Sequence, residues 1–149
     1  TDLTVRLVGK SIATKTISFA FPFAIISSFF ILYYEQNIIS IALRISHASS
    51  IAYALSILID INAFQYFRDK YSYWWVAPSL STFVSNIIDT YSFFFSAFYN
   101  SEDIYMANNW FEIATNQLIL KIIIGLILFL PVYGVLLNYL KKKILIYKK

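Results

Sequence analysis

The sequence predicts an all-α integral membrane protein with four transmembrane helices. Of its 149 residues, 59% are hydrophobic and only 13% are charged, and the mean hydropathy is +0.65. Several apolar stretches reach the roughly 20 residues that a helix needs to cross a hydrocarbon core of about 30 Å. The basic residues gather at the ends of these stretches. This combination excludes an ordinary soluble fold.

The expected helices form one transmembrane domain over residues 1–149, at about residues 16–34, 44–67, 75–99 and 112–140. The first is uncharged and carries Pro22, which a membrane helix tolerates when a neighbour supplies the lost hydrogen bond. The second is rich in small residues that allow close helix packing. The third has Pro78 in its first turn, where a missing N–H costs little. The fourth contains Lys121 and is interrupted at Pro131.

The basic residues indicate the orientation of the helices. If the four helices are successive crossings, ten basic residues lie on one side: Arg6, Lys10, Lys15, Arg68, Lys70, Lys141, Lys142, Lys143, Lys148 and Lys149. Arg44 alone lies on the other side. The positive-inside rule then places both ends of the chain in the cytoplasm. The net charge of +4 is therefore interpreted as a topology signal, and no nucleic acid is expected as a partner.

Several kinds of chemistry lack the residues that they need. The sequence contains no cysteine and a single histidine, His47, so no disulfide framework and no Cys/His metal site is expected. A Ser-His-Asp mechanism likewise has too few parts. We predict no catalytic residue, no metal and no cofactor, and hence a protein that is not an enzyme.

The third expected helix carries a polar stripe. Five residues fall within about 100° of the helical wheel: Ser79, Thr82, Asn86, Asp89 and Ser96. An ionised carboxylate near the bilayer centre costs at least about 2.5 kcal/mol, so Asp89 requires compensation. The stripe is expected to face water, another helix or a ligand.

Lys121 is the expected partner of Asp89, because both lie at a similar depth from the outer ends of their helices. Two interpretations are open: the pair locks the third helix to the fourth, or it handles a ligand or an ion. Asn86 lies one turn from Asp89, and an amide beside a carboxylate suits recognition of a planar heterocycle. An interhelical hydrogen bond is the alternative for Asn86. Thr82 and Ser79 are weaker candidates on the same stripe.

The second expected helix also has a polar face, which ends in Asp60. Arg44 and Asp60 are separated by roughly 24 Å of helix, so they cannot pair with each other and each needs another partner. For Arg44 the two readings are ligand binding and contact of the guanidinium with outer headgroups.

Three blocks of sequence resemble a known family. They are TDLTVRLVGK at the start, WWVAPSLSTFVSNIIDTYSFFFSAFY in the middle and FLPVYGVLLN near the end. In that order they resemble the queuosine precursor transporters, bacterial inner-membrane proteins earlier described as vitamin uptake transporters. The middle block is the most specific, because it combines the Trp pair, Ala-Pro, Ser-Thr, Asn86 and Asp89-Thr90. The resemblance covers nearly the whole chain.

The resemblance implies a six-helix transporter of the bacterial inner (plasma) membrane, with both termini cytoplasmic. It would import the queuosine precursors 7-cyano- and 7-aminomethyl-7-deazaguanine. The four helices of this chain would be its last four. In the family the TDLTVR block lies at the cytoplasmic end of the second helix, so this chain is expected to lack the first helix and most of the second.

A purine-like substrate of this kind would need two features of a site. Its N–H donors suit a carboxylate, for which Asp89 with Asn86 is the candidate, and its flat face suits an aromatic ring, for which Tyr53 and Trp75 are candidates. The oligomeric state, whether a homo-oligomer or a complex with an energising partner, remains open. An alternative is a substrate-binding membrane subunit of a modular vitamin-type importer that is energised by a partner ATPase. The chain has no GxxxxGK[ST] motif, so any ATP use would have to come from that partner. A membrane enzyme or a purely structural bundle is the third reading.

Overall fold

The computed structural model describes residues 2–36 and 38–147, and all of the secondary structure in this part of the chain is helical. The elements in order are α1 (Asp2–Val8), α2 (Lys10–Gln36), α3 (Ile39–Lys70), α4 (Val76–Phe98), α5 (Ile104–Ile124), the π-helical segment η1 (Gly125–Phe129) and α6 (Leu130–Tyr147). The predicted all-α class is confirmed.

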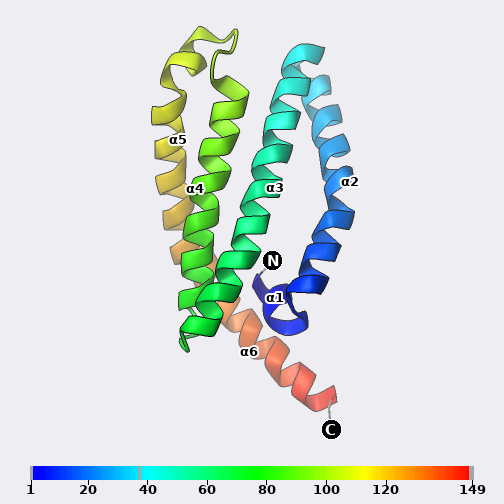
Figure 1. Cartoon of the computed structure of the whole chain (residues 1–149), viewed down its shortest axis with the longest axis vertical. Helices are drawn as coiled ribbons and strands as arrows, with labels where there is room; N and C mark the ends of the chain where they lie inside the picture. The colour runs from blue at the N-terminus through cyan, green and yellow to red at the C-terminus, as the bar shows by residue number, and fades with distance from the viewer. Residues whose placement is uncertain (1, 37, 148–149) are drawn as a thin grey trace.

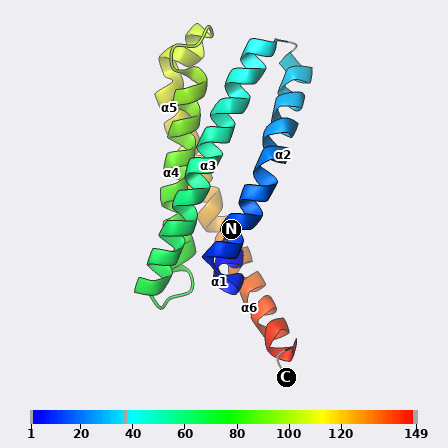
Figure 2. The ribbon, with the colours of Figure 1, turned by 45° about the vertical axis from the view of Figure 1, so that its right-hand side comes forward.

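The long helices α2, α3, α4 and α5 run side by side, and α3 and α4 share the largest interface (Figure 1). α2 packs on α3, and α5 packs on the other side of α4. α6 continues from α5 through η1 and leads away from the bundle at the end where α1 lies, as both views show (Figures 1 and 2). The connection between α3 and α4 lies at that same end. We call this the basic end, because Arg6, Lys10 and Arg68 lie on the elements that meet there.

In the part of the chain that the structure describes, three helical stretches are long and apolar enough to cross a membrane: Lys10–Tyr34, Ile39–Lys70 and Ile104–Lys143. α4 is not among them, although its 23 residues would extend about 34 Å at 1.5 Å per residue. Its polar stripe lowers its hydropathy. Large apolar side chains such as Phe23 on α2 and Ile127 on η1 are exposed, which is typical of a surface that faces lipid. The chain is therefore a multi-pass membrane protein.

The helices extend beyond the apolar runs that predicted them. α2 begins at Lys10 rather than near residue 16, and α3 begins at Ile39 rather than near residue 44. α5 begins at Ile104 rather than near residue 112, because the Asp103 carboxylate accepts a hydrogen bond from the Met106 N–H (3.0 Å) and caps the helix. The residues added at the start of α2 include Lys10 and Lys15, whereas residues 39–43 at the start of α3 are mostly apolar, so the expected start of that helix was simply too late.

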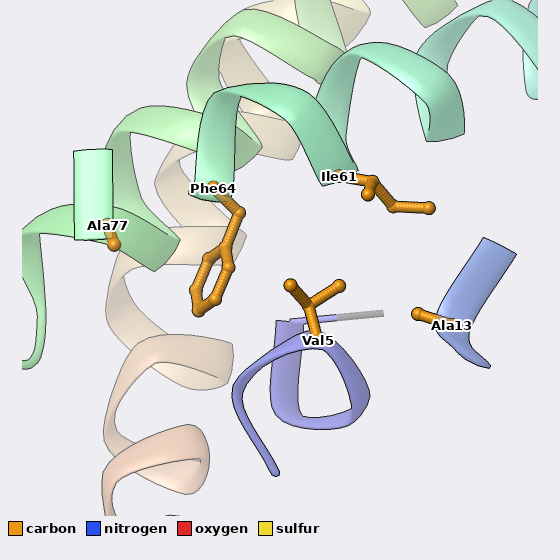
Figure 3. Packing of buried hydrophobic residues seen from close by; sticks show 5 residues of the cluster. All are labelled: Val5, Ala13, Ile61, Phe64 and Ala77. Atoms are coloured by element: carbon orange, nitrogen blue, oxygen red, sulfur yellow. The ribbon is translucent and has the colours of Figure 1, made fainter. Parts of the chain in front are cut away.

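A small apolar cluster holds the basic end together. Val5, Ala13, Ile61, Phe64 and Ala77 come from α1, α2, α3 and α4, and all five are buried (Figure 3). The short helix α1 packs into this cluster because the chain turns sharply at Gly9, whose φ of +92° is readily adopted only by glycine. α1 is therefore fixed against three longer helices.

Small residues dominate the buried positions of α3, as the sequence predicted for a packing helix. Ala42, Ser46, Ala48, Ala52 and Ser56 are all buried. The two hydroxyls donate to backbone carbonyls of their own helix, Ser46 to Leu43 and Ser56 to Tyr53, at 3.1 Å each. These short side chains let α4 approach α3 closely without leaving an unpaired hydroxyl.

The expected interruption at Pro131 is a local change of helix type. Proline has no N–H to donate to the carbonyl four residues earlier, and its ring crowds that carbonyl. The preceding turn is π-helical, and the N–H of Leu130 donates to the carbonyl of Gly125, five residues back. The helix continues as α6 after this turn. Single π-helical turns are frequent at functional sites, and this one borders the cavity described next.

Candidate functional site

A cavity of about 1020 Å³ lies between α4 and the continuous α5–η1–α6 segment, with α1 at its basic end. We call it the large cavity. Four residues of the polar stripe line it: Ser79, Thr82, Asn86 and Asp89. Their spacing of three, four and three residues places them on one face of α4. Ser96, the fifth member of the stripe, is not among the residues that line the large cavity.

The opposite wall is mostly apolar, with two polar side chains from α5. Gln117 and Lys121 line the cavity one helical turn apart, and Ile124, Leu126 and Phe129 complete that side. Gly125 lies across from Thr82, and a Cβ built on Gly125 would be 3.8 Å from the Thr82 methyl group. A concave, mostly apolar space with a few convergent polar groups is the usual form of a small-molecule site.

The expected pair between Asp89 and Lys121 is confirmed. Lys121 Nζ lies 3.0 Å from Asp89 Oδ2 and also donates to Thr90 Oγ1 at 3.2 Å. The side chains of Lys121 and Asp89 are 35% and 31% exposed, whereas Thr90 is fully buried. The ion pair therefore joins α4 to α5 and at the same time presents charged atoms to the cavity.

Tyr133, which lines the large cavity, belongs to a group of aromatic and charged side chains at the basic end. The Tyr133 hydroxyl accepts a hydrogen bond from Arg6 Nη1 (3.1 Å), and the same nitrogen donates to the Trp74 carbonyl (3.1 Å). The Trp74 and Tyr133 rings stack, with 6.4 Å between their centroids. Gly134 lies directly against Trp74, where a Cβ would come within 2.6 Å of the indole ring. Arg6 thus ties α1, the α3–α4 connection and α6 together.

Asp2 also lines the large cavity at this end. Its Oδ1 is buried and has no hydrogen-bond partner among the residues that the structure describes. Burial, together with the nearby carboxylate of Asp60, raises the pKa of Asp2 to about 8. Asp2 therefore keeps its proton at neutral pH.

The remaining predicted residues lie elsewhere. Asp60 is close to Asp2 but is not among the residues that line the large cavity. Tyr53 lines a separate, smaller cavity. Trp75 is half-exposed and packs against Tyr73, with 6.5 Å between ring centroids. Arg44 donates to the carbonyls of Tyr99 and Asn100 at the C-terminal end of α4, where a cation also interacts favourably with the helix dipole.

Sequence reasoning missed three polar residues of the large cavity: Asp2, Gln117 and Tyr133. Gln117 could have been found, because it precedes Lys121 by four residues and must share its helix face. Asp2 is the one acid in a first block that also carries Arg6 and Lys10, which is a weaker signal. Tyr133 follows Pro131, and the altered helical register there hides which way it faces.

A multi-pass helical bundle with a mostly apolar cavity and an internal ion pair is the architecture of a small-molecule membrane transporter. Residues 1–136 match the family described as "Putative vitamin uptake transporter", and the chain belongs to this family. The resemblance read from the three sequence blocks is thereby confirmed.

Two curated relatives carry more specific names. The chain is 40% identical to the "Queuosine precursor transporter" of Escherichia coli (strain K12) and 36% identical to the "Probable queuosine precursor transporter" of Haemophilus influenzae. Each alignment covers 97% of this chain, and it covers 70% and 66% of the two relatives. No solved structure matches the chain. The family and both relatives are named as transporters, not as enzymes.

Proposed function

We propose that this protein imports the queuosine precursors 7-cyano- and 7-aminomethyl-7-deazaguanine across the bacterial inner membrane, and that the large cavity binds them. The names of the two relatives support the substrate class. The observation that carries the proposal is the convergence of Asn86, Asp89 and Lys121 on one cavity of about 1020 Å³. This volume exceeds that of a two-ring heterocycle and leaves room for accompanying water.

The polar groups complement a 7-deazaguanine. The pyrimidine edge of this ring system presents N–H donors, which the Asp89 carboxylate accepts side by side. Its carbonyl oxygen is an acceptor, to which Lys121 or the Asn86 amide donates. The flat ring faces suit Phe83 or Tyr133, both of which line the same cavity. Thr82 and Ser79 supply further hydroxyls toward the basic end.

The proposed topology has four crossings in this chain, with α4 as the crossing that hydropathy alone does not identify. α1, α6 and the α3–α4 connection meet at the basic end (Figure 1), and the positive-inside rule supports a cytoplasmic position for it. Arg44, at the opposite end, caps the C-terminal end of α4. Together with the family match, this supports the last four helices of a six-helix transporter with both ends of this chain cytoplasmic.

Uptake into vesicles tests the proposal. Proteoliposomes that contain the protein should take up labelled 7-cyano-7-deazaguanine in a saturable way, and unlabelled 7-aminomethyl-7-deazaguanine should compete. Adenine, whose pyrimidine edge has a different order of donors and acceptors, serves as the control competitor and should have little effect. Uptake no greater than in protein-free liposomes would contradict the proposed function.

A further inference from the structure

A second, smaller cavity of about 290 Å³ lies between α2, α3 and α4, and we call it the small cavity. The aromatic and polar residues that line it are Phe21, Ser49, Ser50, Tyr53, Asp89 and Phe93. Asp89 is therefore a wall residue of both cavities. Within residues 2–36 and 38–147, no other residue lines both cavities.

The two cavities extend from Asp89 in opposite directions along the bundle. On α4 the large cavity takes residues from Pro78 to Asp89, whereas the small cavity takes Asp89 and Phe93. On α3 the small cavity takes residues 49–53, which lie nearer to the start of α3 at Ile39 than to its end at the basic end. The large cavity thus reaches toward the basic end, and the small cavity reaches toward the opposite end.

The small cavity offers the same two chemical features as the large one. The Phe21 and Tyr53 rings are stacked almost parallel, with 6.0 Å between centroids and 5° between planes, which provides a flat aromatic surface. Ser50 donates its hydroxyl proton to the Ser46 carbonyl, so its oxygen remains an acceptor toward the cavity. Asp89 adds a carboxylate. These groups suit a planar heterocycle that carries N–H donors.

Asp89 is able to exchange partners between the cavities. Lys121 holds its Oδ2, but the lysine also donates to Thr90 Oγ1 at 3.2 Å and therefore keeps a protein partner when Asp89 turns away. Both charged side chains are about one third exposed, so water is able to solvate them during the exchange.

We propose that the small cavity is a second binding site for the same class of planar, N–H-donating heterocycle, and that Asp89 passes the ligand between the two cavities by exchanging Lys121 for it. This inference rests on the proposed function. It adds a binding site on the far side of Asp89, and with it a path through the bundle.

Cysteine accessibility tests this path, because the 149 residues contain no native cysteine. Ser50→Cys reports on the small cavity and Ser79→Cys on the large one. Leu55→Cys is the matched control, since it lies on α3, is exposed, and is not among the residues that line either cavity. Right-side-out and inside-out vesicles would be treated with a membrane-impermeant methanethiosulfonate, with and without 7-cyano-7-deazaguanine. Tyr53→Cys replaces Ser50→Cys if the latter fails to fold.

The proposal predicts that Ser50→Cys reacts from the outer face, that Ser79→Cys reacts from the cytoplasmic face, and that the precursor slows both reactions at least fivefold. Leu55→Cys should react slowly from either face. Protection at Ser79→Cys alone, or labelling of both cysteines from the same face, would contradict the second site. A third result would contradict the proposed function and leave the two-cavity arrangement standing. In that result the two cysteines react from opposite faces, the precursor protects neither of them, and the precursor does not stabilise the protein against heat.

Discussion

The two helices that flank α3 have opposite surfaces. α2 exposes large apolar side chains such as Phe19, Phe23 and Phe30, and its composition suffices to mark it as a membrane span. α4 has a comparable length, but its half-buried polar face carries Asn86 and Asp89, which line the large cavity. Polar groups of this kind are expensive in a membrane unless they have partners or a function. The difference indicates that the polar groups of the bundle are concentrated along α4, whereas the outer face of α2 is suited to lipid.

The largest expected effect comes from breaking the Asp89–Lys121 pair on that side. Lys121→Met leaves the Asp89 carboxylate facing an apolar wall, which should cost about 1–3 kcal/mol of stability and lower uptake at least tenfold. Phe23→Ala on α2, 63% exposed in the wild type, is the control and should change uptake less than twofold. Thermal unfolding in detergent and uptake into proteoliposomes check both variants.

The double variant Asp89→Leu with Lys121→Met separates the two roles of the pair. Replacing both charges by apolar groups of similar size often restores stability, because no uncompensated charge remains. We expect the double variant to unfold near the wild-type temperature and still to lack uptake. Recovery of both stability and uptake would show that the pair only locks α4 to α5.

A smaller effect is expected from disturbing the Trp74–Tyr133 stack, and two glycines on the same continuous helical segment allow a comparison. Gly134→Ala would bring a methyl group within 2.6 Å of the Trp74 ring, so the stacked Trp74 and Tyr133 must shift and uptake should fall several-fold. Gly125→Ala, in the wall of the large cavity, meets only an ordinary contact of 3.8 Å with Thr82, so it leaves the stack in place and should lower uptake less than Gly134→Ala. Equal uptake by the two variants would mean that the Trp74–Tyr133 stack has no role in transport.

A pH dependence of stability is expected from Asp2. Its pKa is raised from 3.8 to about 8, so between these values the folded protein keeps a proton that the unfolded chain has released. The stability that this retained proton gives to the folded protein is therefore lost as the pH rises from 3.8 to about 8. Asp2→Asn does not titrate, so its melting temperature relative to wild type should increase from pH 5 to pH 8. A difference that stays constant with pH would contradict the raised pKa.

The sequence allowed accurate prediction of properties that depend on composition and on spacing within one helix. The all-α membrane class follows from hydropathy, and the common face of Ser79, Thr82, Asn86 and Asp89 follows from helical spacing. The pairing of Asp89 with Lys121 required only an estimate of depth. Each of these predictions uses distances along a single helix or its membrane depth.

Properties that depend on packing between helices could not be read in this way. Tyr53 and Asp89 border one cavity because of the way α2, α3 and α4 pack together, and nothing in the spacing of either residue encodes that. The π-helical turn before Pro131 changes which side chains of α6 face inward, so Tyr133 was missed. Asp2 reaches the cavity only because Gly9 folds α1 back against the bundle. Such residues become visible when the helices are placed together.

Equilibrium binding of 7-cyano-7-deazaguanine to purified protein carrying Asp89→Asn tests the central claim most directly. The claim is that the Asp89 carboxylate in the large cavity accepts hydrogen bonds from the N–H donors of the precursor. Loss of charge-assisted hydrogen bonds worth about 1.5–3 kcal/mol should weaken binding by about tenfold or more. Asp69→Asn, which removes a carboxylate that is 61% exposed and lies outside both cavities, should bind like wild type. Wild-type affinity in a folded Asp89→Asn protein would contradict the claim.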